Sequence, residues 1–258
     1  MNITLLSDLH LEFKNPVSAG EGDVLILAGD ITTVGTVKKD ADFFRRAADN
    51  YNLVVYIPGN HEYYHSDIGN AWDIITEQID DRIVPLNNQS TCYRGVHFVG
   101  STMWTDMNRG NEAVMQQAAE CMSDYNIVTN GVHSLSPVDT LARHMESIDW
   151  FEQVLPTLRG DVVMVTHHAP SLTSVEAPGY GSNMQHAYAT NMDDFIRKYH
   201  SIRLWCHGHA HRKNDYMIGT TRILANPCGY FPDSMQHEFN PNLTVPVRGV
   251  SNGTCPNA

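Results

Sequence analysis

Short runs of β-branched and aliphatic residues recur along the chain, and each run ends in a cluster of polar side chains. An unbroken apolar run of this length is typical of a strand that is buried on both faces, as in a sheet covered by helices. The runs span residues 3–6, 24–28, 53–57, 162–166 and 204–206. We therefore predict strands over these ranges.

Helical periodicity fills the intervals between the runs. Apolar residues repeat every three or four positions between residues 37 and 48, and again, after Asp67, at Trp72, Ile75 and Ile79. A longer helix is predicted to open at Ser136, because a capping residue followed by proline at the first helical position marks a helix start. Its apolar stripe predicts a buried face made of Val138, Leu141, Met145, Ile148 and Leu155.

Two further ranges indicate antiparallel pairing. Residues 93–100 and 215–225 read as hairpin-like strands, and Gly219 breaks the second range. The sheet is therefore not expected to be wholly parallel, and the fold class is α/β with layers of sheet and helix. We predict one domain over residues 1–240, followed by an arm or a disordered tail over 241–258, where the composition is rich in turn residues.

Composition and charge limit the partners and the compartment. The chain has 17 Lys and Arg against 29 Asp and Glu, and this formal charge of -12 argues against nucleic acid or an anionic membrane as a partner. No apolar run is long enough to span a bilayer, and no export signal follows Met1, so we expect a cytoplasmic protein. The five cysteines are scattered and include no C-x-x-C pair, so we expect reduced thiols rather than disulfides or a thiolate zinc site.

The polar clusters share a position and a chemistry. Each follows a predicted strand, and ligands of open α/β sheets bind beyond the carboxyl ends of the strands. Carboxylate, amide and imidazole side chains together suit borderline divalent metals. The clusters are Asp8-Leu9-His10, Gly29-Asp30, Gly59-Asn60-His61-Glu62, His167-His168 and His207-Gly208-His209.

In order and spacing, these clusters resemble the motifs of the calcineurin-like metallophosphoesterase superfamily, from Asn2 to about Tyr230. The resemblance implies a β-sandwich of two mixed sheets flanked by helices, and a site for two divalent metal ions. It assigns Asp8, His10 and His209 to one ion, Asn60, His167 and His207 to the other, and Asp30 to both as a bridge.

Two positions need a comment. His167 is preferred to His168 as the ligand because it directly ends its predicted strand. At Thr33 the chain departs from the family, which has an Asp or a Tyr three residues after the bridging Asp.

The implied chemistry is phosphoester hydrolysis. Two divalent ions about 3.5 to 4 Å apart polarise a phosphoryl group and supply a bridging hydroxide for in-line attack. The catalytic residues would be Asp30 and Asn60 at the ions and His61 as general acid toward the leaving oxygen. Manganese is the expected metal, with iron, zinc, nickel and magnesium as alternatives. A small phosphodiester, such as a cyclic nucleotide or a nucleotide diester, is favoured over a phosphomonoester or a phosphoprotein.

Other interpretations compete with this one. The segment from His61 through Glu62 to His65 matches the H-E-x-x-H motif of zinc proteases, although the preceding strand and Pro58-Gly59 place it at a strand–loop junction rather than within a helix. A non-catalytic, metal-binding interaction scaffold is a further alternative. Five other histidines are given surface or capping roles, namely His133, His144, His200, His211 and His237.

Substrate specificity is expected in the least regular stretches, residues 101–132 and 171–188. Within the first of these, Trp104 and Tyr125 could either face a substrate or pack over the core.

Overall fold

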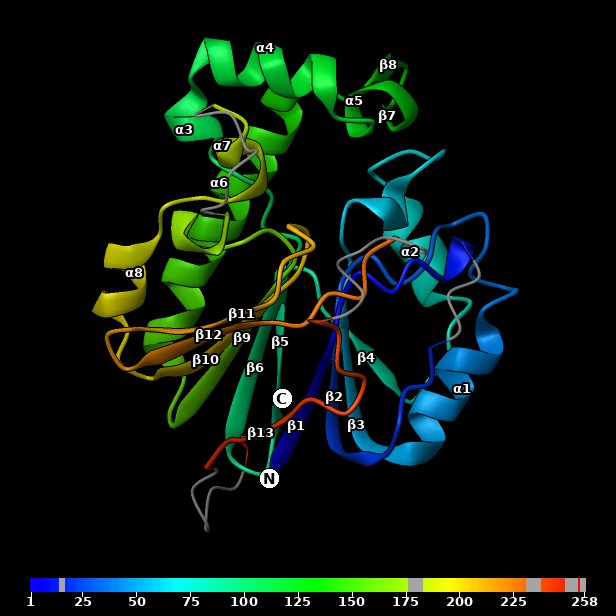
Figure 1. Ribbon diagram of the computed structural model, residues 1–258, viewed down its shortest axis with the longest axis vertical. Helices are drawn as coiled ribbons and strands as arrows, with labels where there is room; N and C mark the ends of the chain where they lie inside the picture. Colours follow the sequence, from blue (N-terminus) through cyan, green and yellow to red (C-terminus); the bar gives the residue numbers. More distant parts are fainter. Residues whose placement is uncertain (14–16, 176–182, 231–237, 249–254, 256–258) are drawn as a thin grey trace.

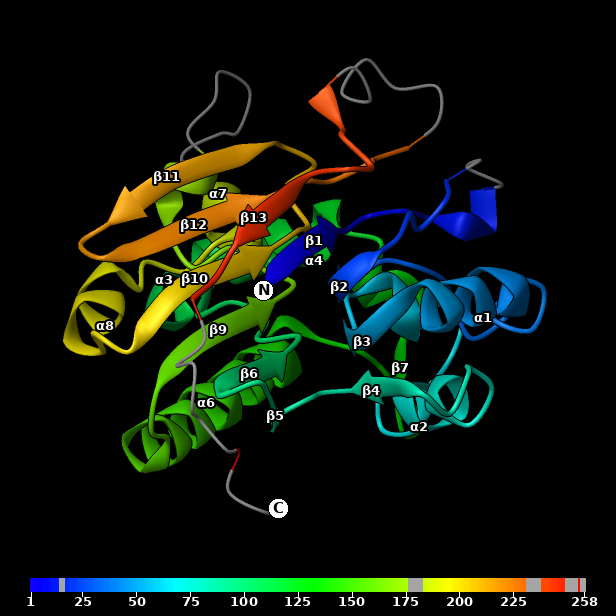
Figure 2. The ribbon, with the colours of Figure 1, turned by 90° about the horizontal axis from the view of Figure 1, so that it is seen from below.

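A computed structural model describes residues 1–13, 17–175, 183–230, 238–248 and 255. Two β-sheets stack at the centre, and helices cover the outer face of each sheet (Figure 1). The view along the strands separates the layers, with α1 and α2 outside one sheet and α6 and α8 outside the other (Figure 2). The predicted α/β fold of two mixed sheets flanked by helices is confirmed.

The first sheet has the strand order β13-β1-β2-β3-β4. Strands β1 to β4 run parallel, and β13 pairs antiparallel with β1 at one edge. The apolar runs at 3–6, 24–28 and 53–57 form the parallel strands, as predicted. The strands are β1 (Asn2–Leu6), β2 (Gly22–Ala28), β3 (Tyr51–Ile57), β4 (Ile83–Pro85) and β13 (Thr244–Pro246).

The second sheet has the order β11-β12-β10-β9-β6-β5, with antiparallel strands at both edges and parallel strands between them. The hairpin over 215–225 is confirmed as β11 and β12. The other predicted hairpin, over 93–100, begins too far along the chain. Its turn lies at Arg94-Gly95, and its first strand precedes that turn. The strands are β5 (Gln89–Tyr93), β6 (Val96–Ser101), β9 (Asp161–Thr166), β10 (Ile202–His207), β11 (Asn214–Ile218) and β12 (Thr221–Ala225).

The main core lies between the two sheets, where Ile3 and Val55 of the first meet Phe98, Val163 and Cys206 of the second. On the outer side of each sheet, one further apolar layer joins the sheet to the helices that cover it. The α-helices are α1 (Ala41–Asn50), α2 (Ala71–Thr76), α3 (Met107–Gly110), α4 (Glu112–Cys121), α5 (Asp124–Ile127), α6 (Pro137–Val154), α7 (Gln185–Tyr188) and α8 (Asp193–Lys198).

A cap of short elements stands above the carboxyl ends of the strands (Figure 1). It contains α3, α4, α5 and α7, together with a small hairpin of β7 (Thr129–Asn130) and β8 (His133–Ser134). Trp104 and Tyr125 are buried in the apolar cluster that holds the cap together. Both therefore pack in the core of the cap, which was one of the two roles predicted for them.

The long helix α6 begins where predicted, with a capping box between Ser136 and Asp139. Its predicted buried face is wrong in part, because Val138 and Met145 are 62% and 59% exposed. The residues that face the protein are Pro137, Thr140, His144, Ser147 and Phe151. Several of these are polar because the helix meets polar partners, as described below for His144.

His144 was predicted to lie at the surface or in a cap, but its side chain is only 5% exposed. Its Nδ1 donates to the carbonyl oxygen of Met103 over 3.0 Å. Burial lowers the pKa of His144, so the ring is neutral at pH 7. His133 and His200 lie at the surface, whereas His237 lies outside the described residues.

The C-terminal region and the cysteines also differ in part from expectation. Residues 244–246 form β13 at the edge of the first sheet. Cys255 forms a disulfide with Cys92 of β5, so the expectation that all thiols are reduced is wrong. Cys121, Cys206 and Cys228 are free. In the described part of the chain, no helix combines the length and the apolar character needed to cross a membrane.

Candidate metal centre

The site residues follow the carboxyl ends of strands from both sheets. The strands β1, β2 and β3 are parallel, and Leu6, Leu27 and Tyr56 are neighbours across the sheet. The carboxyl ends of the three strands therefore lie close together. The loops after them are joined by backbone hydrogen bonds, including 3.0 Å from His10 N to Asp30 O. The loops that follow β9 and β10 of the second sheet lie at the same edge, where Gly208 N donates to His167 O over 3.0 Å.

The backbone of this site is unusual. Five of its residues have positive φ angles of 45° to 64°, a region that non-glycine residues rarely adopt, and strain of this kind clusters at functional sites. These residues are Asp8, His10, Asp30, His209 and His211.

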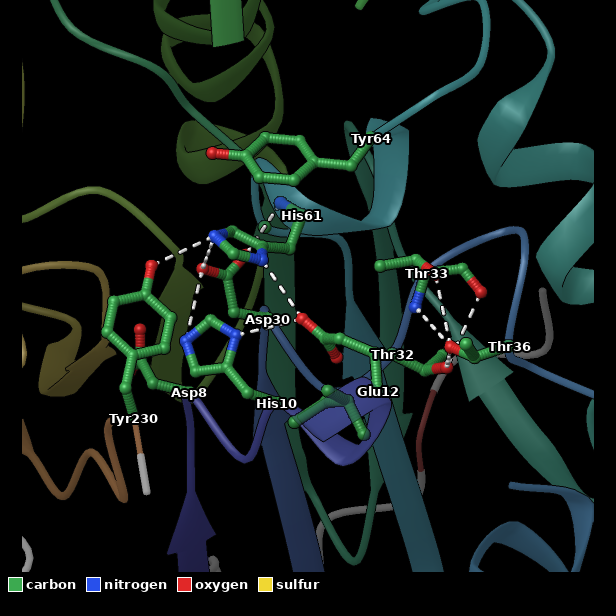
Figure 3. Close-up of polar contacts among 12 residues, drawn as sticks. Asp8, His10, Glu12, Asp30, Thr32, Thr33, Thr36, His61, Tyr64 and Tyr230 are labelled. Atoms are coloured by element: carbon green, nitrogen blue, oxygen red, sulfur yellow. Dashed lines mark hydrogen bonds and ion pairs between the residues drawn. The ribbon is translucent and has the colours of Figure 1, made fainter. Parts of the chain in front are cut away.

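One group of potential metal ligands contains Asp8, His10, Asp30 and His211, whose ligand atoms all lie within 4.8 Å of one another. His10 Nε2 is 3.8 Å from Asp30 Oδ2, and His211 Nε2 is 3.4 Å from Asp8 Oδ1. The two imidazole Nε2 atoms are 3.0 Å apart. Carboxylates and imidazoles from three loops therefore converge on one point. Figure 3 shows three members of this group, Asp8, His10 and Asp30.

A second group shares Asp30 and adds His167 and His209. His167 Nε2 lies 3.4 Å from Asp30 Oδ1 and 3.0 Å from the side-chain oxygen of Asn60. The other nitrogen of His167 donates to the carbonyl of Ala28, which fixes the ring with Nε2 toward Asp30. Asp30 thus stands between the two groups, with one carboxylate oxygen toward each.

Burial and charge act together on the central carboxylate. Burial alone raises the pKa of Asp30, but the charge of His167 and the charges of His61 and His10 hold it well below its usual range. Burial likewise opposes charging of His167, but the charge of Asp30 outweighs it and raises the pKa of His167 to about 10. The site therefore collects positive charge around a buried anion.

The donor set fits divalent metal ions. Asp8 Oδ2 and His209 Nε2 are buried without a hydrogen-bond partner, which is costly unless another group satisfies them. Carboxylate, amide oxygen and imidazole are ligands of borderline divalent metals. A side chain at Gly208 would overlap Asp8 Oδ2, so this glycine is needed to keep the space beside Asp8 open.

His61 stands beside the two groups and is stacked on Tyr64, with ring centroids 4.0 Å apart. Its backbone N–H donates to Asp30 Oδ1 over 2.9 Å, and its Nε2 lies 3.1 Å from the hydroxyl of Tyr230. Burial lowers the pKa of His61, but the charge of Asp30 and the bond to Glu12 outweigh burial and raise the pKa to about 8. His61 is therefore mostly protonated at pH 7 and can donate a proton.

Comparison with known proteins agrees with this geometry. Residues 1–213 match the sequence model of the calcineurin-like phosphoesterases. The chain belongs to the calcineurin-like phosphoesterase family. It is therefore classed as a phosphoester hydrolase, in a family whose members typically bind two divalent metal ions.

Two relatives extend the comparison. An uncharacterized protein, L509, of Acanthamoeba polyphaga mimivirus is 24% identical, over 94% of this chain and 95% of that protein. The crystal structure of a phosphopantetheinyl hydrolase from Mycobacterium tuberculosis has a TM-score of 0.70 and 18% identity, covering 92% of this chain and 90% of that one. The second likeness shows a shared fold.

Within this calcineurin-like phosphoesterase, the structure places His207 apart from the predicted ligands. Its Nε2 is 3.0 Å from the Ser174 hydroxyl, and its Nδ1 is 3.1 Å from the Gly208 carbonyl. Both ring nitrogens are thus engaged by protein groups. Neither of the two ligand groups in the described residues contains His207, so its role as a metal ligand stays a prediction from the sequence.

His211 belongs to the first group of potential ligands, although the sequence analysis gave it a surface or capping role. Its Nε2 contacts both Asp8 and His10, and its side chain is 18% exposed. The sequence did hold a signal for His211. His207, His209 and His211 occupy alternate positions, so His209 and His211 form an H-x-H pair just as His207 and His209 do.

His168 and Thr33 occupy positions next to the site without joining its ligand groups. His168 Nδ1 lies 3.3 Å from the Thr102 carbonyl, and burial lowers the pKa of this histidine to about 3. Thr33 turns toward Thr36, with 3.0 Å between their hydroxyls (Figure 3).

Glu62 does not have the surroundings of a protease base. It lies in a short 3-10 helix, His61–Tyr63, and its carboxylate accepts the backbone N–H groups of Asp30 and Gly59 over 2.9 and 2.7 Å. It is also fully buried. Glu62 therefore braces the loops that carry the ligands, which disfavours the protease interpretation.

A cavity of about 440 Å³ opens above the two groups. Asp30, Asn60, His61, His209 and His211 line its inner part. Three aromatic side chains and one end of the cap form the rest of the lining, namely Tyr64, Tyr188, Tyr230 and residues 121–124. The predicted specificity ranges 101–132 and 171–188 each contribute residues to this cavity, although part of the second lies outside the described residues.

Proposed function

We propose that this protein hydrolyses a small phosphoester, with a diester favoured, using two divalent metal ions. One ion would be held by Asp8, His10, Asp30 and His211, and the other by Asp30, Asn60, His167 and His209. The observation that carries the proposal is the central place of Asp30, which faces both groups at the base of the cavity.

The protein groups and the metal ions divide the chemistry between them. When bound, two divalent ions supply Lewis-acid polarisation of the phosphoryl group and activation of water. Asp30 and Asp8 supply the negative charge that holds cations in a buried site. The His61 imidazolium donates a proton from Nε2 to the departing oxygen, because this nitrogen faces the cavity while Nδ1 is held by Glu12.

The cavity supports a small organic substrate. Its volume falls within the range of small-molecule sites. Tyr64, Tyr188 and Tyr230 offer aromatic surface to a planar leaving group such as a nucleobase. Cyclic nucleotides and nucleotide diesters are therefore the first candidates. The phosphopantetheinyl hydrolase with the same fold adds a phosphopantetheinyl phosphoester as a further candidate substrate.

The test is a substrate screen of purified, manganese-loaded protein. The panel holds a cyclic nucleotide, a nucleotide diester, a phosphopantetheinyl phosphoester, a nucleoside monophosphate and nitrophenyl mono- and diesters. We expect hydrolysis of a diester, and its loss in Asp30→Asn, which alters the ligand common to both ions. Faster hydrolysis of the monoesters would make the protein a phosphomonoesterase. Absence of all hydrolysis by a protein with two bound ions would contradict the proposal.

Manganese is the first metal to test, with iron, zinc, nickel and magnesium as alternatives. Because the ligands include imidazole as well as carboxylate, magnesium, which prefers oxygen ligands, is expected to bind less tightly than manganese. Elemental analysis after metal-replete expression measures the content, and we expect about two ions per chain.

A further inference from the structure

Glu12 accepts hydrogen bonds from two histidines through a single carboxylate oxygen. Its Oε1 lies 3.1 Å from His10 Nδ1 and 3.0 Å from His61 Nδ1 (Figure 3). The side chain of Glu12 is 8% exposed, so little water competes for these bonds. One carboxylate thus joins a proposed metal ligand to the proposed proton donor.

The local backbone brings Glu12 to this position. His10 has a φ of 46°, and the chain then turns through a short 3-10 helix, Leu11–Phe13. Leu11 N donates to Ile31 O over 3.0 Å, which ties this turn to the loop that carries Asp30. The turn therefore directs Glu12 back across His10 toward His61.

The bonds to Glu12 fix the orientation of both rings. Because each Nδ1 is turned to Glu12, each Nε2 points to the opposite side, where His10 Nε2 and His61 Nε2 lie 3.8 and 4.0 Å from Asp30 Oδ2. The two rings meet edge to face, with centroids 4.4 Å apart. A carboxylate that accepts Nδ1–H selects the tautomer with a lone pair on Nε2, as a metal ligand requires.

Neighbouring polar groups do not duplicate this contact. Asp40 accepts the Thr32 hydroxyl over 2.6 Å, and Thr33 bonds Thr36. Asp124 accepts the hydroxyl of Tyr64 over 3.3 Å. Within the described residues, Glu12 supplies the carboxylate that accepts Nδ1–H of the His61 ring.

We propose that Glu12 is a positioning residue that orients His10 for metal binding and His61 for proton donation at the same time. This inference rests on the proposed function. It predicts that removing one carboxylate impairs two separable properties, manganese affinity through His10 and departure of poor leaving groups through His61.

The test compares Glu12→Ala and Glu12→Gln with wild type and with Asp40→Asn. The last variant changes a nearby carboxylate that bonds a threonine instead of a histidine. Titration calorimetry with manganese on the metal-free proteins measures affinity without any turnover. Steady-state rates at saturating manganese are measured on a nucleotide diester and on a nitrophenyl diester.

For Glu12→Ala we expect binding of one of the two ions to weaken about 10- to 100-fold, the usual cost of losing a carboxylate behind a histidine ligand. At saturating manganese, kcat on the nucleotide diester should fall at least tenfold more than kcat on the nitrophenyl diester, because a phenolate leaves with little help from an acid. KM should change little. Glu12→Gln retains a neutral oxygen acceptor and should fall between Glu12→Ala and wild type, whereas Asp40→Asn should match wild type.

Three results would overturn the proposal. They are unchanged manganese affinity in both Glu12 variants, an equal loss of kcat on the two esters, and an equal effect of Asp40→Asn. If Glu12→Ala does not fold, Glu12→Gln gives the same comparison with a conserved shape. Failure of the proposed function looks different, because wild type itself would then bind manganese and hydrolyse none of the esters, while the calorimetric comparison would still decide the role of Glu12 at His10.

Discussion

The carboxylate of Glu62 accepts the backbone N–H of Asp30 over 2.9 Å, although the two residues follow different strands. The same carboxylate accepts Ile31 N, Gly59 N and the Tyr56 hydroxyl over 2.7 to 2.8 Å. Asp30 has a φ of 55°, and strained backbone of this kind persists only where the surroundings hold it. Glu62 is one of the groups that hold it.

Glu62→Ala is therefore expected to destabilise the protein. The substitution leaves several buried donors without an acceptor, and each such donor costs about 1 to 3 kcal/mol. We expect the free energy of unfolding to fall by about 3 kcal/mol or more, as measured by urea denaturation. Glu146→Ala, which changes an exposed carboxyl on α6, is the control and should stay within about 0.5 kcal/mol of wild type.

A different outcome would point to another role for Glu62. If Glu62→Ala were as stable as wild type and lost a peptidase activity, the zinc-protease interpretation of His61-Glu62-x-x-His65 would replace the present one. His65 argues against that outcome, because it lies after the short 3-10 helix with a φ of 59° and so does not continue a helix with His61.

The strands and their polar ends could be predicted from the sequence because burial and periodicity are local signals. The choice of metal ligands among three alternating histidines cannot be made from their spacing alone. His207, His209 and His211 alternate along the chain, and any adjacent pair satisfies the same spacing. The choice depends on where β10 ends, since His207 closes the strand and bonds Ser174, while the positive φ of the next two histidines turns them to the site.

The buried face of α6 shows a second limit. Its apolar positions predicted burial of Val138 and Met145, but the helix docks through polar contacts with distant segments. Ser147 Oγ lies 2.9 Å from Ser101 Oγ, and His144 donates to Met103. Such partners come from residues about 40 positions away, so a hydrophobic pattern does not reveal them.

His144 leads to a prediction about pH. Since burial lowers its pKa, the unfolded chain binds a proton on this residue at a pH where the folded protein keeps it neutral. Its contribution to stability is therefore full above the ordinary histidine pKa of about 6.5 and is lost as the pH falls below that value. The free energy of unfolding of metal-free protein, measured from pH 7 to pH 5, should fall less steeply in His144→Gln than in wild type.

The difference in slope is at most about 1.4 kcal/mol per pH unit, the value for one proton. Glutamine keeps a donor for the Met103 carbonyl, so the variant is expected to fold. His133→Gln replaces an exposed histidine and should leave the wild-type slope unchanged. Equal slopes for His144→Gln and wild type would show that folding does not lower the pKa of His144.

The disulfide gives a prediction about the number of reactive thiols. Cys92 and Cys255 are paired, whereas three other cysteines are free. Protein purified without reductant and denatured should therefore show three reactive thiols, and five after reduction. Peptide mapping should recover the Cys92–Cys255 pair. Five thiols before reduction would support the sequence expectation of reduced cysteines instead.

The three alternating histidines provide the sharpest test of the metal centre. His209 and His211 face the two ligand groups that share Asp30, whereas both nitrogens of His207 bond to protein groups. His209→Ala and His211→Ala should each lower manganese content from about two ions toward one, because each removes a ligand of one ion. His207→Ala should keep about two ions but lose stability, since it empties a buried position and leaves the Ser174 hydroxyl without one partner.

Elemental analysis and urea denaturation of the three variants separate these effects. Asp30→Asn is the reference for impairment of both ions, because its carboxylate faces both groups. Loss of one ion in His207→Ala, with two retained in His211→Ala, would restore the ligand pair read from the sequence. That result would require His207 to break its bond to Ser174 when metal binds, which the buried hydrogen bond opposes. For this reason we expect metal loss to follow His209 and His211.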